Sequence, residues 1–386
     1  MAKRFLLSTL TLTVIVAGFW YATRPPSPAA QPPITNPASN TSGFARAFEP
    51  IEFQFPQDHG PHEDFQTEWW YYTGNLQAES GERFGYQFTI FRRGLTPGAP
   101  GQAGLLTNQV YFSHFAITDV AAQTHRGIER FSRGAGGLAG ARGEPFSVWL
   151  EGWRVDSLNA DGSAVRLQGQ DEAMGIDLTL RAVKPIVLQG ERGLSAKSDA
   201  PGNASYYLSF TRMATEGALR VNGRTLTVTG ESWFDHEWST SALGENAVGW
   251  DWFSLQLSDG RELMLYILRL KDGGVEAVSG GTLVERDGTA RRINLPDFAV
   301  TATGSWASPV SQAVYPSGWR LQIPTAQLDL TIDPYVQAQE MQISVTYWEG
   351  AVKVSGASNG QPVSGNGYVE LTGYVDSLQE VLGRGQ

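Results

Sequence analysis

The chain has 386 residues, a formal net charge of −10 and no cysteine. The acidic balance, without any cluster of Lys and Arg longer than a pair, excludes nucleic acid and anionic lipid surfaces as partners, because both require a basic patch. The absence of cysteine excludes disulfides, thiolate metal sites and cysteine catalysis. The length is sufficient for two medium-sized domains with substantial cores.

The N-terminus has the pattern of an export signal. Lys3 and Arg4 precede an apolar run from Phe5 to about Ala22, which is a positive segment followed by a hydrophobic one. We interpret residues 1–23 as a signal peptide or, if it is not cleaved, as an N-terminal membrane anchor. Residues 24–47 are rich in Pro and Ser and are interpreted as a linker. The folded part is therefore expected to be periplasmic or secreted, either free or tethered to the inner membrane.

Residues 55–76 combine histidines, carboxylates and four consecutive aromatic residues at the start of a predicted strand. Trp and Tyr offer a large apolar face with a polar tip, which suits a ligand that is mostly hydrocarbon and is acted on at one polarised point. The alternative is an aromatic plug that only closes a β-barrel. We predict ligand-binding roles for one acid and three aromatic residues of this block: Glu68, Trp69, Trp70 and Tyr72.

Three side chains of the same block, His59, His62 and Asp64, lie close enough in sequence to bind a metal, with His236 as a further ligand. No helical His-Glu-x-x-His motif or second compact pair of ligands supports such a site. Histidines that hold the chain through hydrogen bonds are the simpler interpretation. We therefore predict no metal site and no cofactor.

Beyond residue 50, apolar and polar residues alternate, for example over residues 84–90 and 341–347. Such alternation predicts half-buried strands, and pairs such as Asn222-Gly223 predict hairpin turns between them. Many short antiparallel strands indicate an all-β protein, either a sandwich or an up-and-down barrel. His114 lies in phase with Phe112 in one such strand, and we expect it in the core or in the wall of a ligand cavity.

The central part of the chain contains acids, an imidazole and indoles: Asp235, His236, Trp238, Trp250, Asp251 and Trp252. An Asp between indoles can have a raised pKa, because burial against apolar surface penalises the carboxylate and leaves a proton to donate near neutral pH. Hydration of an isolated C=C bond needs such an acid, and aromatic faces can stabilise the carbocation until water attacks. We predict catalytic roles for Asp235, His236 and Asp251, and ligand-binding roles for the three indoles. The alternative is a structural Asp235–His236 pair that braces a domain junction.

The sequence Gly356-Ala-Ser358-Asn-Gly360 has the spacing of the nucleophile elbow of a serine hydrolase. The elbow needs a strand-turn-helix, whereas Asn359-Gly360 predicts a hairpin tip. The last histidine of the chain, His236, also precedes Ser358, although the elbow requires a histidine that follows the serine. We therefore do not expect nucleophilic serine chemistry.

Three blocks of the sequence resemble motifs of one known family. The first contains His59-Gly-Pro-His62 and Glu68-Trp-Trp-Tyr-Tyr-Thr-Gly74, the second Gly230-Glu-Ser-Trp-Phe-Asp-His-Glu-Trp-Ser239, and the third Tyr347-Trp-Glu-Gly-Ala-Val-Lys-Val-Ser-Gly356. These blocks resemble the carotenoid 1,2-hydratase (hydroxyneurosporene synthase) and AttH-like family. The resemblance spans roughly residues 50–375. Many bacterial members of this family are described as predicted secreted hydrolases.

The resemblance implies a fold of two lipocalin-like (calycin) antiparallel β-barrel domains, at residues 48–240 and 241–386. It implies a hydrophobic ligand, isoprenoid-like or polyketide-like. We expect the protein to be a monomer. The resemblance leaves two functions open, because a lipocalin cavity needs aromatic residues in either case. One is a cofactor-independent hydro-lyase, which hydrates or isomerises a C=C bond, and the other is a carrier without chemistry.

Overall fold

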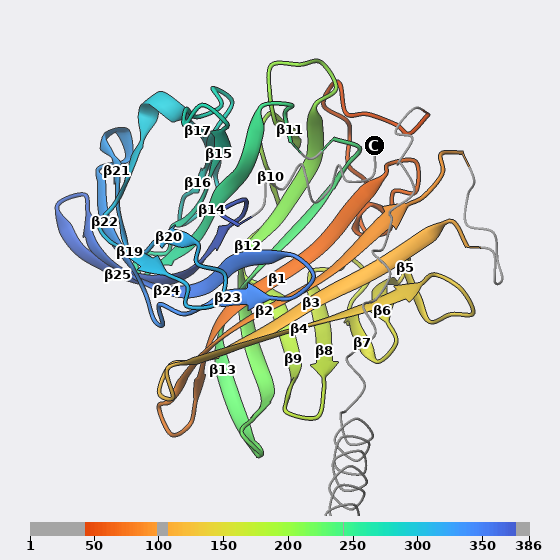
Figure 1. Cartoon of the computed structure of the whole chain (residues 1–386), viewed down its shortest axis with the longest axis horizontal. Helices are drawn as coiled ribbons and strands as arrows, with labels where there is room; N and C mark the ends of the chain where they lie inside the picture. Colours follow the sequence, from red (N-terminus) through yellow and green to blue (C-terminus); the bar gives the residue numbers. More distant parts are fainter. Residues whose placement is uncertain (1–42, 99–106, 242, 376–386) are drawn as a thin grey trace, which may run out of the picture. The chain divides into compact units, whose positions relative to one another are not determined.

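Alternating apolar and polar residues form antiparallel strands in the computed structural model, which describes residues 43–98, 107–241 and 243–375 (Figure 1). The predicted signal or anchor segment, residues 1–23, and residues 24–42 of the linker lie outside the described residues. No helix of the described residues is long and apolar enough to cross a membrane. The helical elements among them are short 3-10 turns: η1 (Gln57–His59), η2 (Leu295–Asp297) and η3 (Pro324–Ala326).

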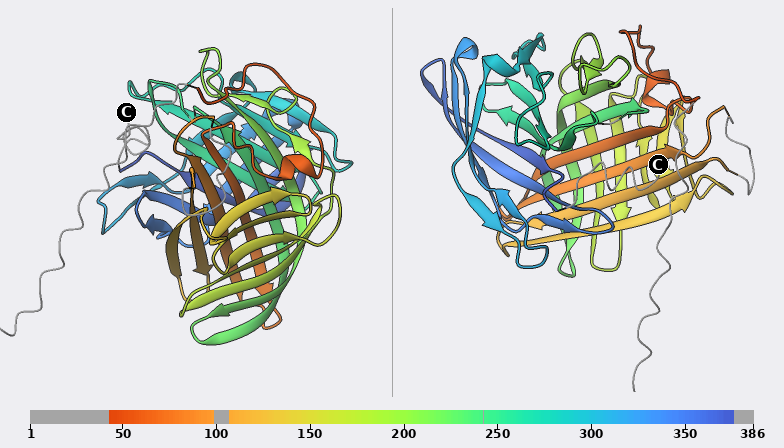
Figure 2. Two further views of the ribbon diagram at one scale, coloured as in Figure 1. Left: turned by 90° about the vertical axis from the view of Figure 1, so that its right-hand side faces the viewer. Right: turned by 45° about the horizontal axis from the view of Figure 1, so that its top comes forward.

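The first sheet curls around a common interior (Figure 2). Its strands are β1 (Thr67–Ala78), β2 (Arg83–Gly94), β3 (Gln109–Asp119), β4 (Thr124–Arg133), β5 (Ala139–Gly143), β6 (Phe146–Leu150), β7 (Trp153–Ser157), β8 (Ala164–Gln170), β9 (Met174–Ala182), β10 (Val187–Leu188), β11 (Leu194–Ala196), β12 (Ala204–Val221) and β13 (Arg224–Ser239). The order along the sheet is β4-β3-β2-β1-β13-β12-β9-β8-β7-β6-β5, with β10 and β11 paired to β12. The sheet nearly closes into a barrel. Its two end strands, β4 and β5, do not pair with each other in the described part of the chain.

The second sheet encloses a core of its own. Its strands are β14 (Ala247–Leu257), β15 (Glu262–Leu270), β16 (Gly280–Val284), β17 (Ala290–Asn294), β18 (Ala299–Ala302), β21 (Trp319–Ile323), β22 (Leu328–Pro334), β23 (Glu340–Gln342), β24 (Thr346–Ser358) and β25 (Gln361–Leu371). Their order is β17-β16-β15-β14-β25-β24-β22-β21-β18, and β23 pairs with β24. A separate ribbon consists of β19 (Ser305–Ala307) and β20 (Val314–Pro316).

Hairpin turns form where Asn-Gly pairs predict them. Asn222 and Gly223 have φ angles of 51° and 72° and join β12 to β13, whose neighbouring residues Val221 and Arg224 pair directly. Positive φ at both central positions defines the tight turn that Asn-Gly favours. Asn359-Gly360 forms the same turn between β24 and β25, with φ angles of 52° and 72°. The predicted hairpin tip after Ser358 is therefore confirmed.

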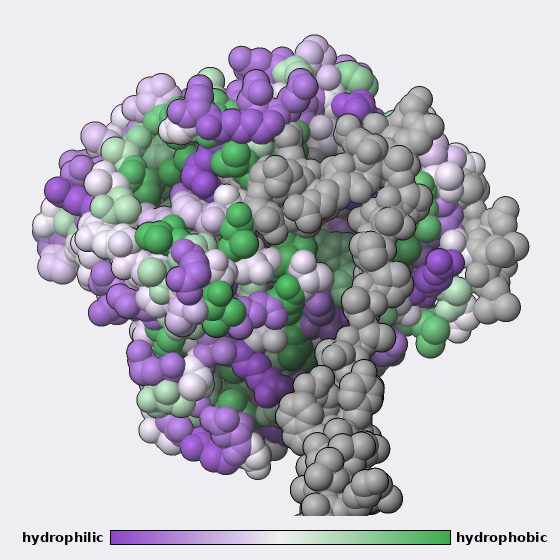
Figure 3. Space-filling model, viewed as in Figure 1, coloured by the Kyte–Doolittle hydropathy of each residue, from purple (hydrophilic) through white to green (hydrophobic). Residues whose placement is uncertain are grey.

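Successive residues of a strand point to opposite faces, and in β1 this alternation separates two environments. Trp70 and Tyr72 point into the interior of the first sheet, where they belong to its core. Trp69 and Tyr71 point outward and join an apolar cluster that also contains Trp252 of the second sheet. The outer face of β1 thus packs against the second sheet. In the view of Figure 1, hydrophobic side chains reach the surface among hydrophilic ones (Figure 3).

The all-β prediction of antiparallel, barrel-like sheets is confirmed. The chain leaves the first sheet at Ser239 and begins the second at Ala247. Both sheets belong to one compact unit, so the division at residue 240 stays a prediction. The described end of the predicted linker packs on the first sheet: Phe44 and Ala47 are buried, and Thr240 donates a hydrogen bond to the carbonyl of Ala45.

Candidate functional site

A cavity of about 100 Å³ lies where the outer face of the first sheet meets the second sheet. Its walls are mostly aromatic, with carboxyl groups among the rings. The lining residues are Trp69, Tyr71, Phe91, Lys197, Tyr207, Asp235, Glu237, Trp250, Trp252, Tyr266, Leu268 and Glu370. A cavity of this composition suits a ligand that is mostly apolar and is contacted by a few polar groups.

Strand register determines which residues face this cavity. Tyr71 of β1 pairs with Asp235 of β13, and Asp235 pairs in turn with Ser209 of β12. On the second sheet, Trp252 of β14 pairs with Glu370 of β25. Because alternate residues share a face, the side chains of Trp69, Tyr71, Asp235 and Glu237 all lie on the outer face of the first sheet.

Asp235 is the buried acid at the floor of the cavity, and its side chain is 3% exposed. Its Oδ1 accepts hydrogen bonds from the Ser209 hydroxyl at 2.5 Å and from the Trp233 indole at 2.6 Å. Its Oδ2 accepts one from the Tyr207 hydroxyl at 2.5 Å. Burial raises the pKa of Asp235 to about 7, although these three donors oppose the shift. Near neutral pH the carboxyl group can therefore hold a proton.

Two further acids, the partly buried Glu370 and the buried Glu349, lie beside each other on β25 and β24. Burial, together with the negative charges of Asp235 and Glu237, raises the pKa of Glu370 to about 7, and the Trp250 indole donates a hydrogen bond to it at 2.7 Å. Burial and the charge of Glu370 raise the pKa of Glu349 well above its usual range. Several carboxyl groups thus share one apolar region, where like charges disfavour simultaneous ionisation.

Glu237 is the acid of the cavity wall that has a cationic partner. The Lys197 ammonium lies 2.6 Å from its carboxylate and also faces the rings of Tyr207 and Tyr266 at 5.5 and 5.4 Å. Neither Asp235 nor Glu370 has an ion-pair partner among the described residues. These two acids are therefore the proton-holding groups of the cavity.

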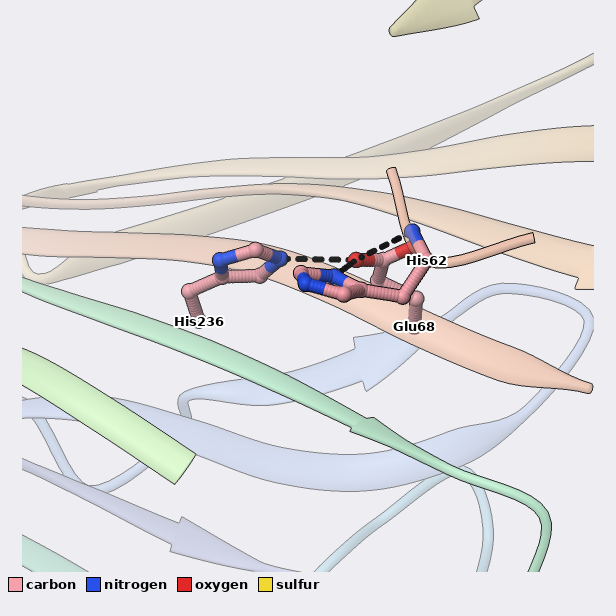
Figure 4. A group of neighbouring side chains, drawn as sticks. All are labelled: His62, Glu68 and His236. Carbon is pink, nitrogen blue, oxygen red and sulfur yellow. Dashed lines mark hydrogen bonds and ion pairs between the residues drawn. The ribbon is translucent and has the colours of Figure 1, made fainter. Parts of the chain in front are cut away.

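A separate polar cluster lies inside the first sheet, around Glu68 (Figure 4). Glu68 Oε1 accepts hydrogen bonds from His62 at 2.8 Å and His236 at 2.9 Å, and Oε2 pairs with the Arg92 guanidinium at 2.8 Å. Burial alone would raise the pKa of Glu68, but Arg92 and His62 hold it well below the usual range. Burial alone would lower the pKa of His62, because it disfavours the charged imidazolium, but the carboxylates of Glu68 and Asp58 raise it.

The three groups His62, Glu68 and His236 place ligand atoms within 4.8 Å of one another and could hold a metal ion. Glu68 already accepts hydrogen bonds from both histidines, however, and Arg92 already neutralises its carboxylate. The metal set suggested by the sequence is not assembled, because His59 contacts the Asp161 carbonyl at 3.2 Å and Asp64 is exposed. His59 and His62 make hydrogen bonds to Asp161 and Glu68, and the absence of a metal site stays a prediction.

The predicted catalytic residues fall in three places. Asp235 faces the cavity, whereas His236, the next residue, points into the first sheet and stacks on Trp70 at 5.0 Å. Asp251 also points away from the cavity: it pairs with Arg269 at 2.9 Å and accepts a hydrogen bond from Tyr374 at 3.0 Å. Adjacent strand residues point to opposite faces, so the sequence neighbours do not act as one group.

The predicted ligand-binding residues divide in the same way. Trp69, Trp250 and Trp252 line the cavity. Glu68, Trp70, Tyr72 and Trp238 lie in the interior of the first sheet, where Trp238 stacks on His62 at 3.6 Å. His114 is on the outer face, where its Nδ1 contacts the Tyr347 hydroxyl at 2.9 Å and burial lowers its pKa to about 3.

Sequence reasoning assigned no role to Glu349 and Glu370. Each acid is two residues from a buried residue on the same face of its strand, Glu349 from Ala351 and Glu370 from Tyr368. This is the signal that could have identified them, because an acid in phase with the buried face of a strand is either paired or has a raised pKa. Tyr71 was also missed. It lines the cavity and donates a hydrogen bond to Glu349 at 2.8 Å.

Comparison with known proteins agrees with the fold. The model of the AttH-like family matches residues 46–374. A search of curated proteins found no match. A solved structure assigned as AttH from Nitrosomonas europaea is 33% identical, with a TM-score of 0.76 over 86% of this chain and 100% of that one.

Kievitone hydratase from Nectria haematococca is 17% identical, with a TM-score of 0.66 over 86% of this chain and 97% of that one. This identity is low enough that the likeness concerns the fold alone. The family match, in contrast, covers most of the chain and is accompanied by a solved structure at 33% identity. Sequence motifs, lipocalin-like architecture and family match together show that the chain belongs to the AttH-like family.

Proposed function

We propose that the protein binds a hydrophobic, isoprenoid-like or polyketide-like molecule in the cavity between its sheets and hydrates a C=C bond of it without a cofactor. The observation that supports this proposal most strongly is the environment of Asp235. This residue is buried, it faces an aromatic cavity, and its pKa of about 7 leaves a proton to donate at neutral pH.

The proposed reaction begins when the carboxyl group of Asp235 transfers its proton to one alkene carbon. A C–H bond forms, the π bond breaks, and the other carbon becomes a carbocation. The indole faces of Trp250 and Trp252, which line the cavity, stabilise this cation through cation–π attraction. The oxygen of a water molecule then attacks the cation and forms the C–O bond.

The attacking water must also lose a proton. Glu370 faces the same cavity and has a pKa of about 7, so it can be ionised while Asp235 is protonated. In the proposed cycle the Glu370 carboxylate takes the proton from the water, and proton exchange through solvent restores both acids. At neutral pH a fraction of the molecules therefore holds a protonated Asp235 beside an ionised Glu370, which is the state that the cycle requires.

One structure with a similar fold carries the name hydratase, which agrees with this proposal. We further propose that the N-terminal segment exports the protein, so that it acts in the periplasm or outside the cell. Fractionation of cells that express the full chain tests this part, and recovery of the protein in the cytoplasm contradicts it.

A carrier without chemistry is the second candidate. Three hydrogen-bond donors already point at Asp235, and such a network is also typical of a structural acid. A carrier would use the same aromatic walls, but its ligand would leave unchanged.

The test uses the full chain, an acyclic polyisoprenoid with a terminal trisubstituted double bond, and water enriched in heavy oxygen. A hydratase forms a tertiary alcohol that carries the heavy isotope, whereas a carrier returns the polyene unaltered. Saturable binding without labelled product refutes the hydration and supports the carrier.

A further inference from the structure

Four aromatic residues form a row across the outer face of the first sheet. Trp69 of β1 pairs with Phe91 of β2, Phe91 with Phe112 of β3, and Phe112 with Phe131 of β4. The ring centroids of consecutive members are 6.4, 4.5 and 5.9 Å apart. We call this row, Trp69–Phe91–Phe112–Phe131, the aromatic ladder.

The ladder leads from the protein surface into the cavity beside Asp235. Phe131 at its outer end is 54% exposed, and Phe112 is partly exposed. Trp69 and Phe91 at its inner end line the cavity. Stacked aromatic side chains that remain open to solvent are typical of a binding surface, because a core role would bury them.

One side of the ladder is bordered by a segment of the second sheet, which includes β23 and the start of β24. Met341 of this segment packs against the backbone of Gly127. Ser344 donates a hydrogen bond to Glu129 at 2.6 Å, and Tyr347 contacts His114. Glu129 is two residues before Phe131, and His114 is two residues after Phe112. Both therefore lie on the same face as the ladder and next to it. The segment therefore forms a wall along the ladder.

The other side carries two arginines. Arg93 and Arg133 both pair with Val110, so they lie on the same face as the ladder and two residues beyond Phe91 and Phe131. No carboxylate of the described residues pairs with either guanidinium. Arg93 is partly buried, and burial lowers its pKa without any acid to oppose the shift. A partly desolvated cation without a partner favours an anionic ligand group.

We propose that the aromatic ladder binds an elongated apolar molecule with one anionic head group, which is held by Arg93 and Arg133 while the far end of the chain reaches the cavity. This inference rests on the proposed function only in taking the cavity as the end of the binding site. The ladder crosses three strand spacings, or about 15 Å, which suits an extended hydrocarbon chain rather than a compact ring system. A guanidinium binds carboxylate or phosphate oxygens through paired hydrogen bonds.

The first test measures binding of cis-parinaric acid, a fluorescent long-chain polyene carboxylic acid, to the full chain. Phe131→Ser removes the outer end of the ladder and is expected to weaken binding by about tenfold. Phe48→Ser is the matched control, because Phe48 is 63% exposed and lies outside the ladder. Equal affinities of the two variants, or no saturable binding by the unaltered chain, overturn the ladder as a binding site.

The second test compares cis-parinaric acid with its methyl ester, which has the same chain but no charge. Arg93→Gln and Arg133→Gln are each expected to weaken binding of the acid by about tenfold and to leave binding of the ester unchanged. Arg291→Gln on β17 is the control, since Arg291 is a partly exposed arginine of the second sheet. Equal affinity of the unaltered chain for acid and ester overturns the anionic head group.

The outcomes separate this inference from the proposed function. If the polyisoprenoid assay yields no labelled alcohol but Phe131→Ser still weakens cis-parinaric acid binding, the proposed hydration is refuted and the ladder is supported as a binding site. If labelled alcohol forms and the two variants Phe131→Ser and Phe48→Ser bind cis-parinaric acid equally well, the proposed hydration is supported and the ladder is refuted as a binding site.

Discussion

Replacing Asp235 with Asn should change how stability depends on pH. The pKa of Asp235 is about 7 in the folded protein, against 3.8 for an ordinary Asp. Between these values the folded state binds more protons than the unfolded state, so the free energy of unfolding decreases as pH rises. The slope from this group is about 1.4 kcal/mol per pH unit, and the total cost above pH 7 is about 4 kcal/mol.

Asn cannot ionise, so Asp235→Asn lacks this contribution. At low pH the variant should be less stable by about 1–3 kcal/mol, because an amide cannot accept all three hydrogen bonds that Asp235 receives. As pH rises from about 5 to 8, the variant should gain stability relative to the unaltered protein. Above neutral pH it should equal or exceed the stability of the unaltered protein.

The assay is urea unfolding followed by tryptophan fluorescence at a series of pH values. Asp177→Asn is the control, because Asp177 is a partly exposed partner of Arg166 and its pKa is lowered, not raised. That variant should show no such gain with rising pH. A constant stability difference between Asp235→Asn and the unaltered protein from pH 5 to 8 would refute the reasoning, since it would mean that Asp235 ionises normally.

The remaining predictions concern structural groups. Glu68→Gln should lower the free energy of unfolding by about 3–5 kcal/mol, because it leaves the buried Arg92 guanidinium without its only carboxylate partner among the described residues; a loss below about 1 kcal/mol in urea unfolding would contradict this. Trp70→Ala should cost a similar amount by creating a cavity inside the first sheet, whereas unaltered stability with weaker ligand binding would place Trp70 in the ligand site. A chain that starts at residue 43 should unfold at the same temperature as the full chain. A chain that starts at residue 46 lacks the buried Phe44, and its free energy of unfolding should be lower by about 2 kcal/mol. Equal melting temperatures of the two shortened chains would contradict a role of Phe44 in anchoring this segment to the first sheet.

Much of the fold can be predicted from local sequence, because strand alternation and turn chemistry are local properties. The alternation in residues 84–90 corresponds to part of β2, and Asn222-Gly223 forms the expected hairpin. The pairing of β1 with β13 is different, because it joins residues that are far apart in sequence. Local patterns do not specify such a pairing, and the family resemblance supplied the architecture instead.

The candidate site was predicted less completely, for a physical reason. Asp235 and His236 are neighbours in sequence, yet one faces the cavity and the other faces the interior of the first sheet. Applying strand alternation to the central motif would have separated them. Glu370 could not be placed beside Asp235 by any local rule, because the two acids come from different sheets and meet only when the outer face of β13 packs against β25 and its neighbours.

The most direct test of the central claim is the hydration rate of Asp235→Asn relative to the unaltered full chain, measured with the polyisoprenoid under saturating conditions. If Asp235 donates the proton, the rate should fall by at least ~100-fold while the affinity for the polyene changes little. A rate that is unchanged in Asp235→Asn would contradict the assignment of Asp235 as the catalytic acid.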